Sequence, residues 1–197
     1  MNDHRRRASF AFPPLTIMPR FLLALLVAAM ALPAAAQADL PDWHTPVVEG
    51  VGPSVHLPNA AVQPDTSLTY RLVFDVVEGG TDGAAPKGLV QVARTLNSFA
   101  LYGMRPEQME IVAVLHGPAT AAALSDAAHR ARVGGDNPAL GLVRRLRELG
   151  VEVFVCGNAL TGHGFATSEV ADEVAVATSA LAVVSTYQLR GYALMAF

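Results

Sequence analysis

The chain has 197 residues, 52% of them hydrophobic and 16% charged, and its formal net charge is −3 at pH 7. An acidic balance without a basic cluster argues against nucleic-acid binding, because that binding depends on neutralising phosphates with lysine and arginine. The single cysteine, Cys156, excludes an intramolecular disulfide framework. In an exported protein, such a thiol is buried, paired with another chain, or reactive.

Residues 18–38 have the pattern of a secretory signal peptide. Arg20 supplies a positive charge, residues 21–32 form an apolar stretch, and Ala36-Gln37-Ala38 is a small-x-small cleavage site. We therefore expect residues 1–38 to be removed on export to the periplasm. Cleavage would make the chain more acidic, because it removes several arginines and leaves almost every carboxylate in place.

A membrane anchor is the alternative for this stretch. The uninterrupted apolar run ends at Pro33, and it is shorter than the roughly 20 residues that span a bilayer. We therefore expect no membrane association after cleavage. Met18 would make a normal start of its own, so we interpret the arginine-rich residues before it as a mis-assigned upstream extension. A twin-arginine signal fits those residues poorly.

Two regions follow the signal. Residues 39–67 predict an extended lead-in segment, because they lack a sustained apolar period and have prolines at positions 41, 46, 53, 58 and 64. Residues 68–197 predict an α/β domain, in which short apolar runs alternate with helical stretches. The predicted strands cover residues 69–77, 110–115, 151–155, 174–177 and 192–195. The predicted helices cover residues 87–102, 120–132, 138–149, 168–171 and 180–189.

Five strands joined by crossover helices indicate a doubly wound, mostly parallel five-stranded sheet with helices on both faces. Local signals mark some helix ends. Asn137 is expected to cap the helix that Pro138 opens, and Gly150 to end that helix in a left-handed conformation. Thr167 or Ser168 is expected to cap the short helix.

Three segments directly follow predicted strands: Asp75 to Gly80, His116-Gly117-Pro118 and Cys156-Gly157-Asn158. In a doubly wound sheet, such segments converge at the carboxyl ends of the strands, where ligands bind. The segment from Glu78 to Gly83 could offer backbone amides to an anion, but it lacks the spacing of a phosphate loop, so a flexible turn is favoured. The candidate ligand-binding residues at this edge are Asp75, Gly117, Gly157 and Asn158.

Cys156 is the candidate nucleophile, because it lies where a strand runs into a helix whose positive dipole end stabilises a thiolate. The backbone amides of Gly157 and Asn158 are expected to solvate that thiolate. His116 is its candidate catalytic partner, because an imidazole can accept the thiol proton or stabilise the thiolate. The alternatives stay open. A free cysteine is often a packed core residue, and an isolated histidine beside Gly-Pro is often structural. Soft-metal binding by Cys156 with His116 or His163 is a minor alternative, and without a short ligand pair we expect no metal and no cofactor.

Residues 70–197 resemble the DsrE/DsrF-like family, in its small exported branch. The resemblance rests on an H-G-P segment, His116-Gly117-Pro118, and a C-x-N-A-L segment from Cys156 to Leu160. The first strand from Tyr70 to Asp75, the helical Leu96-Asn97-Ser98 and the tail from Tyr187 to Ala193 also match. The resemblance implies a flavodoxin-like domain that assembles into trimers or hexamers. It also implies that Cys156 carries sulfane sulfur as a persulfide.

This resemblance leads to a first hypothesis of a periplasmic sulfur carrier or sulfurtransferase-like protein. Its partners would be copies of itself and a thiol or sulfane-sulfur donor or acceptor. Known sulfur-relay members work in the cytoplasm, so the predicted export is a departure from the family pattern. The main rival is a non-catalytic, oligomeric protein of the periplasm that binds a small ligand while Cys156 only packs.

Overall fold

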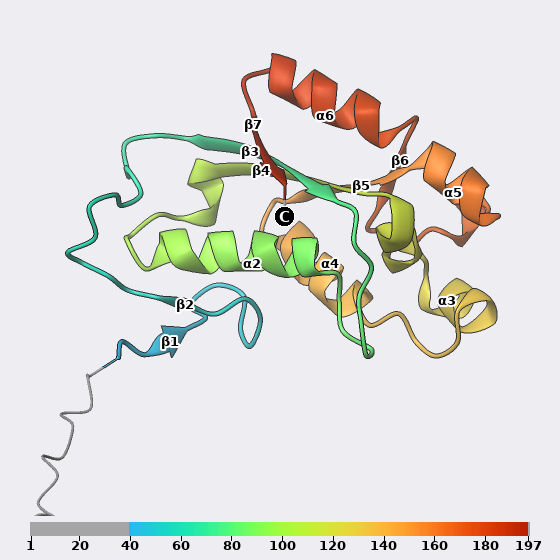
Figure 1. The fold of residues 1–197 in the computed structure, drawn as a ribbon, viewed down its shortest axis with the longest axis horizontal. Helices are drawn as coiled ribbons and strands as arrows, with labels where there is room; N and C mark the ends of the chain where they lie inside the picture. Colours follow the sequence, from blue (N-terminus) through green and yellow to red (C-terminus); the bar gives the residue numbers. More distant parts are fainter. Residues whose placement is uncertain (1–39, 197) are drawn as a thin grey trace, which may run out of the picture. The chain divides into compact units, whose positions relative to one another are not determined.

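A five-stranded parallel sheet forms the centre of the region that the computed structural model describes, residues 40–196 (Figure 1). Its strands are β3 (Tyr70–Val76), β4 (Met109–Leu115), β5 (Glu152–Cys156), β6 (Ala175–Ala177) and β7 (Ala193–Ala196). They lie in the order β6-β5-β4-β3-β7, and neighbouring strands are parallel. The predicted α/β fold is therefore confirmed, and its strands differ from the predicted ranges by at most one residue at each end. The predicted signal peptide, its cleavage site and the alternative start at Met18 lie outside the described residues.

Helices cover both faces of this sheet, as predicted. The long helices α2 (Lys87–Ala100) and α4 (Leu140–Glu148) pack on one face, and α6 (Ala180–Leu189) packs on the other (Figure 1). The connections explain this division, because right-handed crossovers that step the same way along a sheet place their helices on the same side. α2 and α4 both connect strands that step from β3 toward β5, whereas α6 connects β6 back across the sheet to β7.

The two faces carry separate hydrophobic cores, because successive strand residues point to opposite faces. In β3, Leu72, Phe74 and Val76 face α2 and α4, whereas Val73 packs with Val183 of α6. The core under α2 and α4 is the larger one. Its helical members include Leu89, Val92, Leu96, Val143 and Leu146.

The predicted helix over residues 120–132 is wrong, because the segment forms two short elements. A 3-10 helix, η2 (Gly117–Ala123), ends first, and the α-helix α3 (Asp126–Arg132) begins after it. The hydroxyl of Ser125 accepts the N–H of Ala128 at 3.3 Å and so caps α3. Leu124, just before this cap, forms an isolated antiparallel bridge with Val170. The alanine-rich composition suits a continuous helix, but this cap and bridge end one element and begin another.

The predicted end of α4 is confirmed, but its predicted start is two residues early. Gly150 has a φ of +86° and follows the helix as a left-handed terminator. Asn137 accepts the N–H of Ala139 at 3.0 Å, and that turn precedes the first helical residue, Leu140. The side-chain amide of Asn137 also donates to the carbonyl oxygens of Ala122 and Leu124. Asn137 therefore joins the start of α4 to the end of η2.

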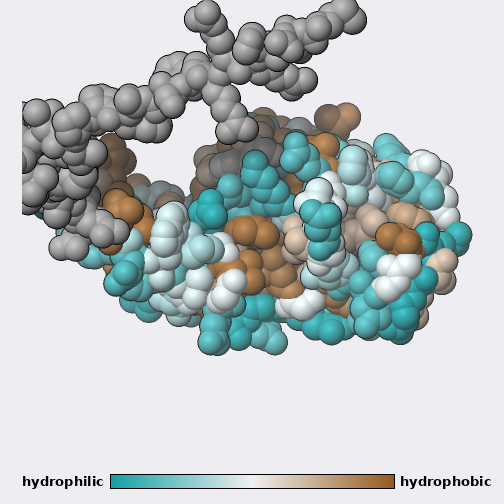
Figure 2. All heavy atoms as spheres, turned by 60° about the horizontal axis from the view of Figure 1, so that its bottom comes forward, coloured by the Kyte–Doolittle hydropathy of each residue, from teal (hydrophilic) through white to brown (hydrophobic). Residues whose placement is uncertain are grey.

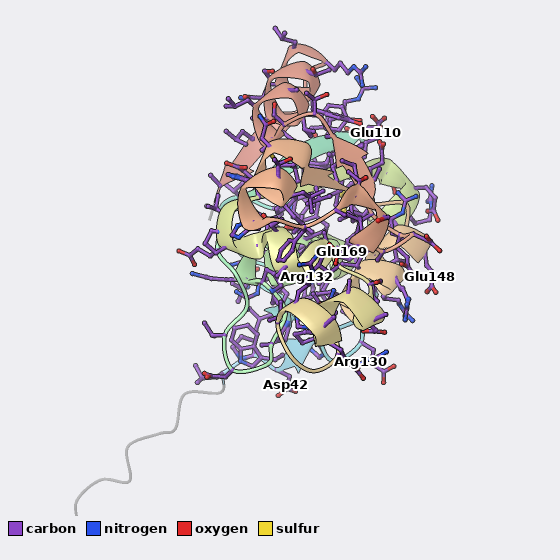
Figure 3. The ribbon with its side chains drawn as sticks, turned by 90° about the vertical axis from the view of Figure 1, so that its right-hand side faces the viewer. Asp42, Glu110, Arg130, Arg132, Glu148 and Glu169 are labelled. Atoms are coloured by element: carbon purple, nitrogen blue, oxygen red, sulfur yellow. The ribbon has the colours of Figure 1, made fainter. Side chains whose placement is uncertain are left out.

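The short helix predicted near residue 168 is the 3-10 helix η3 (Thr167–Glu169). Neither Thr167 nor Ser168 caps it, because the capping position is Ala166, whose N–H donates to the Glu169 carboxylate at 2.7 Å. The same carboxylate pairs with Arg132 of α3 at 2.7 Å, and Figure 3 shows the two side chains close together. This pair holds the pKa of Glu169 below its ordinary value.

The lead-in segment packs against the domain. It contains two short strands, β1 (Trp43–His44) and β2 (Ser54–Val55), which pair antiparallel. The fully buried Asn97 of α2 holds the turn between them: its side-chain oxygen accepts the N–H groups of Val47 and Val48 at 2.9 and 2.8 Å. Its amide donates to the carbonyl oxygens of Val48, Val51 and Gly52. One side chain thus fixes the lead-in on the long helix.

The remaining short elements are the 3-10 helix η1 (Pro106–Gln108), which leads into β4, and the helix α5 (Gly157–His163), which follows β5. Within residues 40–196, none of the helices has the length and apolar character needed to cross a membrane.

Candidate functional site

The strands β3, β4 and β5 end side by side and bring three predicted residues to one face of the sheet. Successive side chains of a strand point to opposite faces of the sheet, so Asp75 lies on the same face as Val73, which packs against α6. The register pairs Leu115 of β4 with Val155 of β5. The next residues, His116 and Cys156, therefore follow side by side at the carboxyl ends of these strands.

A pocket of about 230 Å³ opens at this point. Asp75, His116 and Cys156 line it on the side of the sheet, and the remaining lining residues are Asn158, Ser179, Ala180, Leu181 and Val184. One wall is therefore polar and ionisable, and the wall formed by α6 is mainly apolar. A pocket with this mixture can hold a small, partly apolar molecule next to the reactive groups.

Cys156 lies at the junction of β5 and α5 and acts as the N-cap of α5. Its sulfur accepts the N–H of Ala159 at 3.4 Å, and the residue is only 6% exposed. The predicted amides were those of Gly157 and Asn158, and in the described structure the amide bonded to the sulfur is that of Ala159. An N-cap side chain meets the second or third amide of its helix, which explains this difference.

Asp75 and His116 form the closest polar contact in the pocket. The His116 Nε2 atom is 2.7 Å from a carboxylate oxygen of Asp75, and both side chains are about one quarter exposed (27% and 29%). A carboxylate only accepts hydrogen bonds, so Nε2 carries the proton in this contact. In the neutral ring, Nδ1 is then the acceptor, and it has no hydrogen-bond partner among residues 40–196. The pair therefore presents a histidine with a defined tautomer in the pocket that Cys156 also lines.

The two predicted glycines, Gly117 and Gly157, do not line the pocket. Gly117 turns the chain after β4 with a φ of +52°, a conformation that favours glycine. Its carbonyl oxygen accepts bonds from Thr120 and from the Nε2 atom of His163 at 2.6 and 2.9 Å. A Cβ atom on Gly157 would come within 3.0 Å of the Ala177 carbonyl, so a glycine there lets β6 approach closely. Of the predicted ligand-binding residues, Asp75 and Asn158 line the pocket.

Sequence reasoning missed the wall that α6 contributes. The helix itself is predicted, and its cap is a recognisable signal, because the Ser179 hydroxyl accepts the N–H of Ala182 at 3.0 Å. The sequence pattern did not predict that the chain returns from β6 across the sheet to β7. This return brings Leu181 and Val184 of α6 to the pocket.

His163 does not line the Cys156 pocket. Its ring is exposed, bonds to the Gly117 carbonyl and stacks on Phe165 with ring centroids 5.7 Å apart. Across residues 40–196, no group of three or more histidine, cysteine, aspartate or glutamate residues could hold a metal ion.

The model of the DsrE/DsrF-like family matches residues 71–197. The chain belongs to the DsrE/DsrF-like family. In this DsrE/DsrF-like chain, the matched region contains all the residues that line the Cys156 pocket, and the lead-in segment precedes it.

Two solved structures are similar to this DsrE/DsrF-like chain. A protein of unknown function from Methanobacterium thermoautotrophicum, MTH1491, is 20% identical, with a TM-score of 0.49 over 65% of this chain and 99% of its own. The ychN protein from E. coli is also 20% identical, with a TM-score of 0.46 over 64% of this chain and 99% of its own. No curated protein matches the sequence.

Proposed function

We propose that this protein is a sulfur carrier that holds sulfane sulfur as a persulfide on Cys156 and passes it to another thiol. One observation carries the proposal: a single pocket holds the lone cysteine together with the bonded Asp75 and His116 pair. Membership of the DsrE/DsrF-like family supports it. A small persulfide or polysulfide fits the class of donor, because the pocket has about 230 Å³ of space.

The loading step needs only a thiolate and a donor with a sulfur-sulfur bond. The Cys156 thiolate attacks the outer sulfur of a donor R–S–SH and forms a new sulfur-sulfur bond. The bond between R–S and that outer sulfur breaks, and its electron pair leaves with R–S⁻. Cys156 then holds the outer sulfur as a persulfide. In the delivery step, an acceptor thiolate attacks that sulfur, and Cys156 leaves as a thiolate.

Proton movement in these steps is assigned to His116. With Nε2–H bonded to Asp75, the Nδ1 atom is the acceptor that can take the proton of the Cys156 thiol and return it to the departing thiolate. The amide of Ala159 donates to the sulfur of Cys156, the atom that would hold the transferred sulfur. The exposed Asn158 lines the pocket and can hydrogen-bond a bound donor.

Intact mass spectrometry after incubation with cysteine persulfide tests this function. The expected result is one added sulfur on the wild-type protein, lost on treatment with a reducing thiol and absent from Cys156→Ser. The acceptor thiol should gain the same sulfur in persulfide form. An equal mass increase on Cys156→Ser, or no increase on either protein, would refute sulfur transfer.

A non-catalytic ligand-binding protein remains the second candidate, because Cys156 is only 6% exposed. The rate at which a maleimide labels the native thiol separates the two. Slow labelling of the native protein with rapid labelling after unfolding favours a packed cysteine and the binding role. Labelling that is rapid in the native protein and slowed by a bound persulfide donor favours the carrier.

We also propose that the protein acts after export, in the periplasm, and as an oligomer of copies of itself. The signal pattern before residue 39 supports export. Expression in a bacterium with a periplasm, followed by N-terminal sequencing, should give a periplasmic protein that begins near Asp39. A cytoplasmic protein with its N-terminus intact would contradict export.

A further inference from the structure

A second pocket, of about 580 Å³, lies apart from the Cys156 site. The two pockets share no lining residue. Three segments enclose the second pocket: the loop between β3 and α2, the helix η2, and the connection between α3 and α4. Its volume is within the usual range for small-molecule sites, roughly 300 to 1,000 Å³.

His129 of α3 supplies an open polar group to this pocket. Its side chain is more than nine-tenths buried, and its Nδ1 atom is 3.0 Å from the carbonyl oxygen of Gly135. A carbonyl only accepts, so Nδ1 carries the proton, and the Nε2 atom of the neutral ring is an acceptor. Within residues 40–196, Nε2 has no hydrogen-bond partner. In residues that are not exposed, each solvent-inaccessible side-chain nitrogen or oxygen atom of this region does have a partner, so Nε2 itself must be accessible to solvent. Nε2 is therefore accessible from the pocket that His129 lines.

The rest of the pocket is largely apolar and without a free charge. Prolines 86, 118 and 138 and Ala122 give it firm apolar walls, and the glycines of both loops bring the backbone close. Its one acidic lining residue, Asp136, pairs with Arg130. Figure 2 shows one face of the molecule, on which patches of hydrophobic residues lie between hydrophilic ones. Such a pocket favours a neutral ligand over an ion, because it offers a ligand charge no free partner.

We propose that this pocket binds a small, neutral, partly apolar molecule that donates an N–H group to Nε2 of His129. The apolar walls take the apolar part of the ligand, and the histidine fixes its orientation. A ligand with a methyl group in place of the N–H group binds more weakly, because it leaves Nε2 desolvated and without a partner. This site is independent of the persulfide chemistry at Cys156.

A purely structural histidine is the competing explanation, because the bond from Nδ1 to Gly135 also holds the connection after α3. His129→Asn separates the two roles. The side-chain amide of asparagine can replace Nδ1–H as the donor to Gly135, but it has nothing at the position of Nε2. His129→Gln reverses this, because its longer amide reaches toward the position of Nε2. His129→Asn should therefore fold normally and lose the ligand contact.

Benzamide and acetophenone are matched probes, because they differ by an NH₂ group against a methyl group on the same planar frame. We expect benzamide to shift the ¹⁵N resonance of His129 Nε2 in the full-length protein and to bind at least about fivefold more tightly than acetophenone. His129→Asn should abolish that preference without lowering the melting temperature. Equal binding of both probes, no binding of benzamide, or a preference retained in His129→Asn would overturn the proposal. The comparison of the two probes on the wild-type protein decides the matter even if the variant fails to fold.

Discussion

The hydrogen bond between Asp75 and His116 determines which ring nitrogen of His116 carries the proton. Asp75 acts as a positioning residue, because its carboxylate holds the proton on Nε2 and leaves Nδ1 free. Asp75→Ala removes this preference, and the rate of sulfur transfer from Cys156 should fall by roughly tenfold or more. Stopped reactions with a persulfide donor, followed by mass spectrometry, measure the rate.

Nuclear magnetic resonance distinguishes this role from a structural one. The ¹⁵N shifts of His116 should report the Nε2–H form in the wild-type protein and a mixture of tautomers in Asp75→Ala. Asp75→Asn should retain part of the rate, because its amide oxygen still accepts from Nε2–H. A transfer rate that stays unchanged in Asp75→Ala would contradict the positioning role.

Ionisation of Tyr192 should make the stability of the fold depend on pH in the alkaline range. Burial, together with the hydrogen bond from its hydroxyl to Glu110 at 3.0 Å, raises the pKa of Tyr192 to about 12. A pKa above that of the unfolded chain means that the neutral phenol stabilises the fold. This contribution is complete below pH 10 and is lost as the pH rises from about 10 toward 12. Chemical unfolding at several pH values should show this loss.

Absorbance titration of tyrosinate provides the matched readout. Tyr192→Phe should remove the latest of the ionisation steps and flatten the dependence of unfolding free energy on pH between 10 and 12. Tyr102→Phe should leave that late step in place. If Tyr192→Phe and the wild-type protein lose stability in parallel over this range, the assignment of the late step to Tyr192 is wrong.

At the scale of the elements, the attachment of the lead-in to α2 depends on Asn97. Its side chain makes five hydrogen bonds to the backbone of residues 47–52 and is fully buried. Asn97→Ala leaves these N–H and carbonyl groups without partners, and each buried group without a partner costs about 1 to 3 kcal/mol. We expect the free energy of unfolding to fall by about 3 kcal/mol, measured by denaturant titration.

The control is Arg94→Ala on the same helix, because Arg94 has an exposed side chain. It should change the free energy of unfolding by no more than about 0.5 kcal/mol. Limited proteolysis adds a local readout, because a detached lead-in should be cut within residues 40–67 before the domain is. A small effect of Asn97→Ala, equal to that of Arg94→Ala, would show that other contacts hold the lead-in.

The sequence predicted the strands well because their signal is strong. The central strands β3, β4 and β5 are largely buried and are short apolar runs, whereas the edge strands β6 and β7 are apolar but mostly exposed. All five appear within a residue of the predicted positions. The rule that strand ends converge then brought Asp75, His116 and Cys156 to one edge, and the structure places them in one pocket. The contact between Asp75 and His116 depends on strand register and on which face each side chain occupies, and the sequence reasoning did not use these.

Other features depend on contacts between distant segments, which sequence periodicity does not report. The break at Ser125 depends on a cap and on the bridge from Leu124 to Val170. The docking of the lead-in depends on Asn97, whose position in an amphipathic helix gives no sign of its partners. The pocket wall formed by α6 depends on the return of the chain across the sheet.

At the scale of the whole molecule, the two faces of the sheet are covered unequally. Two long helices cover one face, and α6 covers the other. Across its ten residues, α6 carries no charged side chain. It buries Ala180 and Val183 against the sheet, and it exposes Leu181 and Leu189 by 83% and 90%. The outer surface of α6 also exposes a serine, a threonine and a glutamine, so it is uncharged and carries two exposed leucines among polar side chains. Exposed apolar side chains rimmed by polar residues suit this surface to a partner.

We predict that this outer surface of α6 contacts a second copy of the chain, in line with the oligomer proposed above. Leu189→Glu places a charge in that contact, and it should shift the protein toward the monomer because burying an unpaired carboxylate is unfavourable. Sedimentation velocity or light scattering over a range of concentrations measures the shift. Val62→Glu is the matched control, because Val62 is 89% exposed but belongs to the lead-in segment. A wild-type protein that stays monomeric at high concentration, or a Val62→Glu variant that dissociates as readily as Leu189→Glu, would exclude α6 as the contact surface.

Because Leu181 lines both this surface and the Cys156 pocket, assembly through α6 would also restrict access to the thiol. Maleimide labelling of Cys156 should then be faster in Leu189→Glu than in the wild-type protein.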